Sequence, residues 1–493
     1  MIESGRAIEP KETRPSGDLA RPPPLILDLD GTLIATDTLA ETLLLYLKES
    51  PIRVVQALIW LSHGVAHLKR HLAAVVALDI DRLPVRPEAL SLALAASADR
   101  EVYIATAADS DIATAMAARF PCFAGAIGSQ GEINLKGSAK AAALTARFPD
   151  GFDYVGDSPA DLPVWRAARG ATYIGPSATL ARRLRREKPD AEVVGVARAG
   201  PRVWAKALRL HQWSKNLLLF VPLALGGKAL DTRAWTACLL GFIALGLLAS
   251  STYVLNDLLD LQDDRAHWSK KDRAFASGEI SPWVGLWVVP LGLAAGFAVG
   301  AFDHRGGVIE GLIGYLALTL LYSFRLKREP VVDATVLGGL YTLRLAIGVL
   351  CAQVAWSTWL LVFSMFMFTS LSFAKRFTEL ERLATKGGDK PAGRGYRPAD
   401  RPVVLALGVS LSSAAVLVMV MYLIEEAFRA KYYKAPHLLW ALPIILALWL
   451  GRVWLLCGRG ELNDDPVAFA VRDPVSLVLG GVIGFTLAAA LML

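Results

Sequence analysis

Long apolar runs fill the second half of the chain. Most are close to the ~20 residues that a helix needs to cross the hydrocarbon of a bilayer. They lie at residues 217–225, 235–255, 282–302, 307–322, 331–351, 356–373, 403–424, 437–456 and 474–493. Because backbone groups inside hydrocarbon must find partners within their own segment, the pattern predicts an all-helical, multi-pass bundle of about nine transmembrane helices over residues 217–493.

The first half alternates short apolar strands with helical segments. The predicted strands are residues 25–33, 102–107, 154–156, 172–175 and 191–196. Such alternation is typical of an α/β fold with a parallel sheet. We expect this domain over residues 25–198, with a helical cap at residues 37–100. Residues 1–24 mix charges with Pro and Gly and lack the apolar core of a secretory signal, so a disordered lead is expected there.

Composition agrees with a chain that lies partly in a membrane. Of 493 residues, 54% are hydrophobic, and the mean hydropathy of +0.42 exceeds the usual soluble range. The net charge of +7 is concentrated in residues 182–186 and in short loops, which favours anionic lipid and phosphate partners over nucleic acid. The four cysteines show no metal-binding spacing, so neither zinc nor a disulfide framework is indicated.

Basic loops predict the orientation. Residues 265–273, 325–328 and 382–401 are basic and alternate with nearly neutral turns, so the positive-inside rule places them and the N-terminal domain in the cytoplasm. The basic residues at 429–434 oppose this orientation. The expected location is the inner (plasma) membrane of the cell. Residues 199–216, which join the two parts, are a basic amphipathic linker suited to the interface.

An acidic face follows the apolar run at residues 235–255. At about 100° per residue, its side chains fall within an arc of roughly 120° on a helix; they are Asn256, Asp257, Asp260, Asp263 and Asp264. Crowded carboxylates favour Mg²⁺, which binds carboxylates together with substrate phosphates. The basic residues that come next suit a diphosphate: Arg265, His267, Lys270, Lys271 and Arg273.

Carboxylates also follow the strands of the first half. Asp28 and Asp30 end the first strand and precede Gly-Thr, while Thr106 ends the second. Later, Asp157 and Asp161 stand in Gly-Asp-Ser-Pro-Ala-Asp after a third strand. This order resembles the haloacid dehalogenase (HAD) phosphatases, whose fold is a Rossmann-like parallel sheet with a cap.

The HAD resemblance implies a phosphatase site. Asp28 would be the nucleophile that takes the phosphoryl group, and Asp30 the acid/base for the leaving oxygen. Thr106 would bind the phosphate, and Lys140, with Lys136 as the alternative, would stabilise its charge. The implied Mg²⁺ ligands are Asp28, Asp30, Asp157 and Asp161. A non-catalytic regulatory or binding module stays the alternative for this domain.

Three histidines in the predicted cap, His63, His67 and His71, recur every four residues. They have no acidic neighbours in the sequence, so a cap surface is favoured over a metal site. A cap that rests on the membrane surface stays open.

The motif at residues 256–267 looks like the first aspartate motif of the UbiA superfamily of intramembrane prenyltransferases. With Gln-Trp-Ser-Lys-Asn at residues 212–216 and Ala-Lys-Arg-Phe at residues 374–377, the chain resembles the decaprenyl-phosphate phosphoribosyltransferase branch. The usual second aspartate pair is incomplete, because Asp333 is followed four residues later by Leu337. Arg344 stands in the middle of an apolar run, where a cation needs partners.

The resemblance implies a Mg²⁺-dependent transferase. Asp257, Asp260 and Asp264 would be catalytic and, with Asn256, would hold the metal. Phosphoribosyl diphosphate would lose its diphosphate, and a polyprenyl phosphate would supply the attacking oxygen. The alternative is prenyl transfer to an aromatic or other small acceptor. The predicted substrate-binding residues here are Gln212, Lys215, Asn216, Asn256, Arg265, His267, Lys270, Lys271, Arg273, Tyr322, Lys327, Arg344, Lys375 and Arg376.

The two predicted activities suggest a sequence of reactions. A lipid that carries phosphoribose still holds a phosphomonoester, which is the kind of group that a HAD phosphatase hydrolyses. We therefore expect the N-terminal domain to act on the product of the membrane domain. The sequence leaves lipid chain length and oligomeric state open.

Overall fold

The computed structural model describes residues 22–493 apart from 51, 131–133, 268–269, 303–305, 386–394, 431, 463–468 and 471. Most of the predicted lead, residues 1–21, lies outside the described residues. The chain divides into two compact units. Unit 1 comprises Met1–Gly200 and Leu259–Trp283, and unit 2 comprises Pro201–Leu258 and Val284–Leu493.

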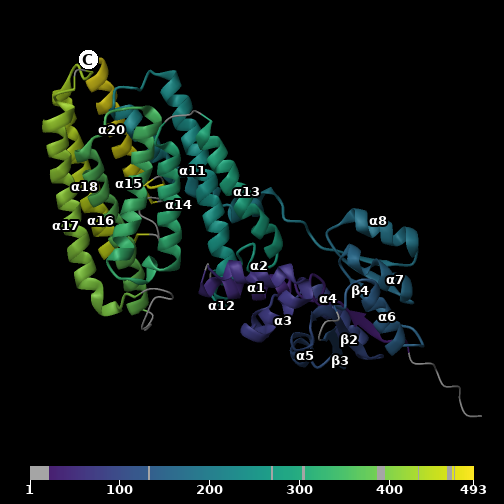
Figure 1. The fold of residues 1–493 in the computed structure, drawn as a ribbon. Coiled ribbons are helices and arrows are strands. Elements are labelled where there is room, and N and C mark those ends of the chain that lie inside the picture. Colours follow the sequence, from purple (N-terminus) through teal and green to yellow (C-terminus); the bar gives the residue numbers. More distant parts are fainter. Residues whose placement is uncertain are drawn as a thin grey trace, which may run out of the picture. The chain divides into compact units, whose positions relative to one another are not determined.

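Unit 1 contains a six-stranded parallel sheet in the order β3-β2-β1-β4-β5-β6 (Figure 1). Short apolar segments form its strands: β1 (Leu25–Leu27), β2 (Val102–Asp109), β3 (Gly125–Ser129), β4 (Asp153–Gly156), β5 (Ala171–Gly175) and β6 (Glu192–Gly195). The sequence pattern anticipated five of these strands and missed β3, which is short and rich in Gly and Ala. The predicted first strand, residues 25–33, is shorter in the structure, because the chain turns after Leu27.

Helices cover both faces of the sheet. They are α4 (Pro87–Ala96), α5 (Ser110–Ala118), α6 (Ser138–Arg147), α7 (Leu162–Ala167) and α8 (Ala178–Glu187). One core joins Leu25 and Leu27 of β1 to Ala89 and Ala93 of α4, and a second surrounds Trp165. Because α4 packs on the sheet, the last part of the predicted cap belongs to the sheet domain instead.

The cap is a group of three helices: α1 (Thr38–Glu49), α2 (Arg53–Ser62) and α3 (Val65–Val75). They share a small core of Tyr46, Ala57, Leu68 and Leu72. The rings of His63, His67 and His71 lie next to one another on these helices in tilted arrangements, with centroids 5.1 and 4.1 Å apart. Among the described residues they join no cluster of potential metal ligands, and their place on a cap surface stays a prediction.

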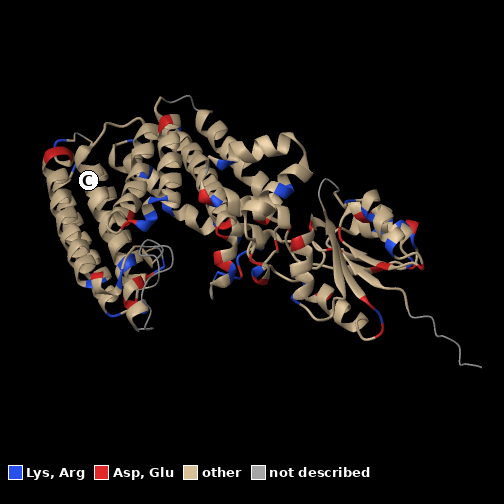
Figure 2. Ribbon diagram, turned by 60° about the horizontal axis from the view of Figure 1, so that its bottom comes forward, with Lys and Arg blue, Asp and Glu red and all other residues tan. Residues whose placement is uncertain are grey.

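Unit 2 is helical. It begins with α9 (Pro201–Ala207), the 3₁₀ segment η3 (Leu210–Phe220) and α10 (Val221–Leu225). The longer helices are α11 (Thr232–Leu259), α13 (Pro282–Ala301), α14 (Val308–Phe324), α15 (Val332–Ala352), α16 (Thr358–Thr385), α17 (Arg401–Tyr422), α18 (Ala441–Gly458) and α20 (Pro474–Met492). Charged residues are sparse along these helices and gather near their ends (Figure 2).

Seven helices among the described residues are long and apolar enough to cross a membrane. The predicted number of nine is not confirmed. The helix α14 is apolar but shorter than these seven, with 17 residues. The first predicted span, residues 217–225, is split between η3 and the five-residue α10, with Pro222 at the start of α10 and two glycines after it.

Candidate active sites

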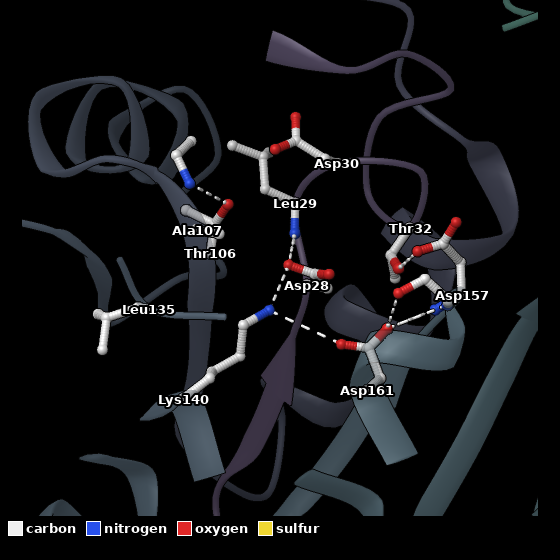
Figure 3. Close-up of polar contacts among 12 residues, drawn as sticks. Asp28, Leu29, Asp30, Thr32, Thr106, Ala107, Leu135, Lys140, Asp157 and Asp161 are labelled. Carbon is white, nitrogen blue, oxygen red and sulfur yellow. Dashed lines mark hydrogen bonds and ion pairs between the residues drawn. The ribbon is translucent and has the colours of Figure 1, made fainter. Parts of the chain in front are cut away.

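The predicted phosphatase residues meet at one edge of the sheet. Asp28 directly follows β1, and Asp157 directly follows its neighbour β4. Thr106 lies in β2, the other neighbour of β1. Since the carboxyl ends of parallel strands lie at one edge, the topology brings these side chains together, and Figure 3 shows them around Asp28.

Asp28 is buried and held by one of its two carboxylate oxygens. Oδ1 accepts hydrogen bonds from the backbone N–H of Leu29 and from Lys140 Nζ, both at 2.9 Å. Oδ2 accepts no hydrogen bond from the described residues, so it is the oxygen that the predicted role as nucleophile would use. The structure places Lys140, and not the alternative Lys136, against Asp28. Burial raises the pKa of Asp28 to about 6, although Lys140 opposes this rise.

Asp28, Asp157 and Asp161 form a cluster that suits a divalent cation. One ligand atom from each lies within 4.8 Å of the others. Burial, followed by repulsion from Asp28 and Asp161, raises the pKa of Asp157 well above its ordinary value. A cation would relieve this repulsion, so the residues fit Mg²⁺.

Asp161 and Asp157 have different surroundings within that cluster. Asp161 Oδ2 accepts the N–H groups of Asp157 and Ser158 and the Ser158 hydroxyl, and Oδ1 accepts the Tyr154 hydroxyl at 2.9 Å. Asp157 accepts one long bond, 3.4 Å, from Thr32. Asp157 is thus the more open ligand, and Asp161 orients the turn that carries it.

Asp30 stands apart from the metal cluster. Its oxygens accept the N–H and the hydroxyl of Thr38, at 2.7 and 3.2 Å, and Thr38 is the first residue of α1. Burial, followed by repulsion from Asp37, raises the pKa of Asp30 to about 7. A carboxyl group with this pKa can give and take a proton near neutral pH, as an acid/base must. Its predicted role as a metal ligand stays a prediction.

Sequence reasoning missed Lys69, Arg86 and Tyr154. Lys69 of the cap donates to the carbonyl of Ala107 at 2.7 Å and lines a cavity with Thr38 and Asp109. Arg86 donates to the carbonyl of Gly31, and Tyr154 bridges Lys140 and Asp161. No motif marks the two cations, and Tyr154 stands in a strand whose last three residues are all buried, so alternation of polar and apolar residues does not single it out.

The aspartates of the UbiA-like motif at residues 256–267 contact basic side chains. Asp257, buried in α11, pairs with Arg209. In unit 1, Asp260 Oδ1 is 3.2 Å from Lys48 Nζ, and Asp264 Oδ2 is 2.6 Å from Arg273 Nη1. Burial raises the pKa of Asp264 despite Arg273.

The other predicted residues of this motif are on the same segments. Asn256 is half-buried in α11, Lys270 is 3.9 Å from Asp264 Oδ1, and His267 is partly exposed after α12 (Leu261–Ala266). Lys271 is exposed. Arg265 donates to Glu41 and to the carbonyl of Ala276, so its guanidinium is engaged within the protein.

Arg344 lies buried in α15 among neutral partners. Nε donates to Asn216 Oδ1 at 3.1 Å, Nη1 to the carbonyl of Leu340 and Nη2 to the Tyr315 hydroxyl at 2.9 Å. The amide nitrogen of Asn216 is itself buried without a hydrogen-bond partner among the described residues. Lys215 Nζ lies 5.7 Å from the centre of the Tyr341 ring, which Arg344 also faces. These donors suit an anionic group.

A second buried group surrounds Asp333. Arg376 of α16 pairs with Asp333 of α15 and with Glu379, and the Tyr322 hydroxyl donates to Asp333 Oδ1 at 2.8 Å. The predicted phosphate-binding Arg376 is thus matched by two carboxylates. The remaining predicted residues, Gln212, Lys327 and Lys375, are half-buried in η3, η4 (Leu326–Arg328) and α16.

Comparison with known protein families identifies unit 2. Residues 217–489 match the model of the UbiA prenyltransferase family. The chain belongs to the UbiA prenyltransferase family. With its seven apolar helices, this membership makes it an integral membrane protein with a UbiA-type transferase domain.

Three similar proteins illustrate how far the likeness extends. The uncharacterized protein y4nM of Sinorhizobium fredii is 42% identical over 93% of this chain and 89% of its own length, so the likeness includes the N-terminal part. Nodulation protein NoeC of Azorhizobium caulinodans is 34% identical over 56% of this chain and 89% of its own. The decaprenyl-phosphate phosphoribosyltransferase of Mycobacterium tuberculosis is 32% identical over 56% of this chain and 89% of its own length.

A solved structure of a UbiA homolog from Archaeoglobus fulgidus bound to DMAPP and Mg²⁺ covers 59% of this chain and 99% of its own, with 16% identity and a TM-score of 0.45. The UbiA match starts at residue 217 and so leaves the parallel sheet of unit 1 outside it. It includes residues 259–283, although these fold into unit 1.

Proposed function

We propose that this UbiA-family protein transfers 5-phosphoribose from phosphoribosyl diphosphate to a polyprenyl phosphate, and that unit 1 is a HAD phosphatase that dephosphorylates the product. In the transfer, the bond between C1 of the ribose and the diphosphate oxygen breaks, and a bond from C1 to an oxygen of the lipid phosphate forms. In the second reaction, the bond between the 5-oxygen of the ribose and phosphorus breaks as the phosphoryl group passes to Asp28, and water then hydrolyses this aspartyl phosphate to release inorganic phosphate. Both reactions are expected on the cytoplasmic side of the membrane.

The observation that best supports the proposed transfer reaction is the buried contact between Arg344 and Asn216. A cation buried among neutral partners is costly unless an anion joins it. The unpartnered amide nitrogen of Asn216 adds a second donor. A phosphate group of a substrate would satisfy both. The likeness to decaprenyl-phosphate phosphoribosyltransferases supports the same substrates.

Aspartates 257, 260 and 264, with Asn256, are the residues proposed to hold Mg²⁺ in the transferase. Bound there, the ion would supply positive charge to the departing diphosphate. Arg209 and Arg273 keep Asp257 and Asp264 in place. Lys215 and Arg344 would bind the phosphate groups of the substrates.

In the phosphatase reaction, each residue has a separate task. Asp28 Oδ2 attacks phosphorus, and Lys140 neutralises charge beside Oδ1. The Thr106 hydroxyl accepts from the N–H of Ala108 at 3.0 Å, which leaves its proton for a phosphate oxygen. Asp30 gives a proton to the leaving oxygen. Asp28, Asp157 and Asp161 would hold Mg²⁺, which supplies charge to the transferring phosphoryl group.

A labelling experiment tests the transfer reaction. Membranes that contain the protein are incubated with ribose-labelled phosphoribosyl diphosphate, polyprenyl phosphate and Mg²⁺, and the lipid fraction is counted. We expect labelled lipid from wild type and a loss of at least about a hundredfold in Asp257→Asn and Asp260→Asn. Prenylation of an aromatic acceptor without ribose transfer would favour the alternative reaction.

A lipid analysis tests the coupling of the two reactions. In Asp28→Asn, the transferred phosphoribosyl lipid should accumulate with its 5-phosphate, because the nucleophile is missing. The dephosphorylated lipid should appear only with intact Asp28. Its formation at the wild-type rate in Asp28→Asn would show that unit 1 serves another substrate or is a non-catalytic module.

A further inference from the structure

The segment at residues 259–283, which we call the aspartate loop, belongs by sequence to the transferase but folds into unit 1. It lies inside the UbiA match and carries Asp260 and Asp264. Within unit 1 it contacts α1, the first helix of the cap, the turn before this helix, and Arg82, whose Nη1 donates to the carbonyl of Gln262 at 3.5 Å. The transferase motif and the phosphatase-like domain therefore share one structural element.

The central contact is a buried ion pair. Glu41 of α1 has a relative exposure of 1%, and the side chain of Arg265 is 7% exposed. Arg265 Nη2 donates to Oε1 at 2.7 Å and Nη1 to Oε2 at 3.1 Å, which is a two-bond pairing of guanidinium and carboxylate. The Thr36 hydroxyl donates to the same carboxylate, and Arg265 Nε holds the carbonyl of Ala276.

Two further contacts fix the ends of the aspartate loop. Lys48, two helical turns after Glu41, lies 3.2 Å from Asp260 Oδ1 and 2.6 Å from Asp263 Oδ2. Near the other end, Gly278 has a φ of +80° and is so close to Ala35 that an added Cβ would lie 2.4 Å from its carbonyl oxygen. The loop thus touches residues 35, 41 and 48 in succession.

The strength of these contacts differs. Removal of one partner from a buried ion pair leaves the other charge buried without compensation, which is strongly destabilising. The Lys48 contacts are partly exposed and individually weak. Glu41 is therefore the main anchor, and Lys48 adjusts the acidic end of the loop.

We propose that α1 is a positioning element of the transferase, in which Glu41 and Lys48 hold the aspartate loop in the arrangement that transfer requires. The same helix begins at Thr38, which holds Asp30, so one helix supports both predicted sites. The effect on catalysis rests on the proposed transfer reaction. The docking of the loop is a separate property that can be measured without substrate.

The experiment uses the full chain in detergent and measures hydrogen exchange of the aspartate loop, together with transfer. In Glu41→Gln, exchange of residues 259–283 should rise at least about tenfold, whereas strands β1 and β4 should keep wild-type protection. Transfer should fall at least about tenfold, with a higher Mg²⁺ requirement and an unchanged KM for polyprenyl phosphate. An unfolded variant would instead lose protection in the strands.

Three further variants separate this role from general destabilisation. Glu49→Gln removes an exposed glutamate at the end of α1 that pairs with Arg53, and it should leave loop exchange unchanged. Lys48→Met should raise exchange only near Asp260 and Asp263. The double variant Glu41→Gln with Arg265→Gln should restore part of the protection, because no buried charge is left unpaired.

Wild-type loop protection in both Glu41→Gln and Lys48→Met would overturn the proposal. So would transfer at the wild-type rate in a Glu41→Gln protein whose loop exchanges freely. If wild type transfers no phosphoribose, the proposed function fails, but the exchange results still decide whether α1 holds the loop.

Discussion

At the scale of single residues, burial gives two neighbouring carboxylates of unit 1 different properties. The pKa of Asp28 is raised to about 6 and that of Asp30 to about 7. Both carboxyl groups therefore change protonation state closer to neutral pH than an ordinary aspartate, and Asp30 does so at the higher pH. The proposed roles of nucleophile and acid need such a difference.

These pKa values predict how the stability of unit 1 depends on pH. Both are raised above the ordinary value of 3.8, so the fold favours the protonated forms. Without divalent cations, protection of β1 and β4, corrected for intrinsic exchange, should fall as the pH rises from about 4 to about 7. Mg²⁺ should restore protection at about pH 8 and have little effect at about pH 5, because it binds carboxylates. A Mg²⁺ effect of equal size at both pH values would contradict this.

Gly31 provides a second prediction at this scale. Its φ is +76°, and an added Cβ would lie 2.2 Å from Asp157 Oδ2. Gly31→Ala should therefore strain the backbone by about 1–3 kcal/mol and displace Asp157. Phosphomonoester hydrolysis should be nearly lost, with a higher Mg²⁺ requirement. Gly195→Ala is the matched control, because an added Cβ there meets nothing within 4 Å.

At the scale of elements, the start of α1 links helix capping to the site. Asp37 is the N-cap residue and accepts the N–H of Ala40 at 2.9 Å. Its charge is also the second cause, after burial, of the raised pKa of Asp30. Asp37 thus stabilises the start of the helix and raises the pKa of Asp30, the proposed acid.

The variant Asp37→Asn should separate these two effects. Asparagine caps a helix about as well as aspartate, so the fold should persist, while the pKa of Asp30 should fall. The alkaline limb of the pH profile for phosphomonoester hydrolysis should move to lower pH. Asp37→Ala should give the same shift and also lose about 1 kcal/mol of stability. An unmoved alkaline limb in both variants would exclude Asp30 as the acid.

At the scale of the whole molecule, two buried arginines of unit 2 differ in the charge of their partners among the described residues. Asp333 is fully buried and pairs with Arg376, which also binds Glu379. Arg344 has neutral partners instead. We therefore expect Arg376 to stabilise the bundle and Arg344 to bind substrate.

Two matched substitutions test this difference. Arg376→Met should leave Asp333 unpaired and cost about 3–5 kcal/mol, seen as a smaller monodisperse fraction after heating in detergent. Adding Asp333→Asn should recover much of that loss. Arg344→Met should leave the monodisperse fraction after heating unchanged and raise the KM for a phosphorylated substrate about tenfold. An unchanged KM would remove Arg344 from the substrate site.

The sequence by itself determined the division into an α/β part and an apolar helical part. Short strands that alternate with helices, and apolar runs near 20 residues, are local patterns of the sequence, and each helix satisfies its backbone hydrogen bonds within its own segment. It also placed carboxylates after β1 and β4, which parallel topology brings to one edge. The acidic face at residues 256–264 could likewise be predicted from the sequence alone.

Only the tertiary structure decided which partners those residues meet. Lys140 rather than Lys136 reaches Asp28, Lys69 comes from the cap, and Glu41 meets Arg265 across 224 positions of sequence. Such pairs are fixed by chain folding and carry no local pattern. The first predicted span, residues 217–225, is divided in the structure between η3 and the short α10, a break that hydropathy alone does not show. Hydropathy reports what a segment can bury, whereas packing decides what it contacts.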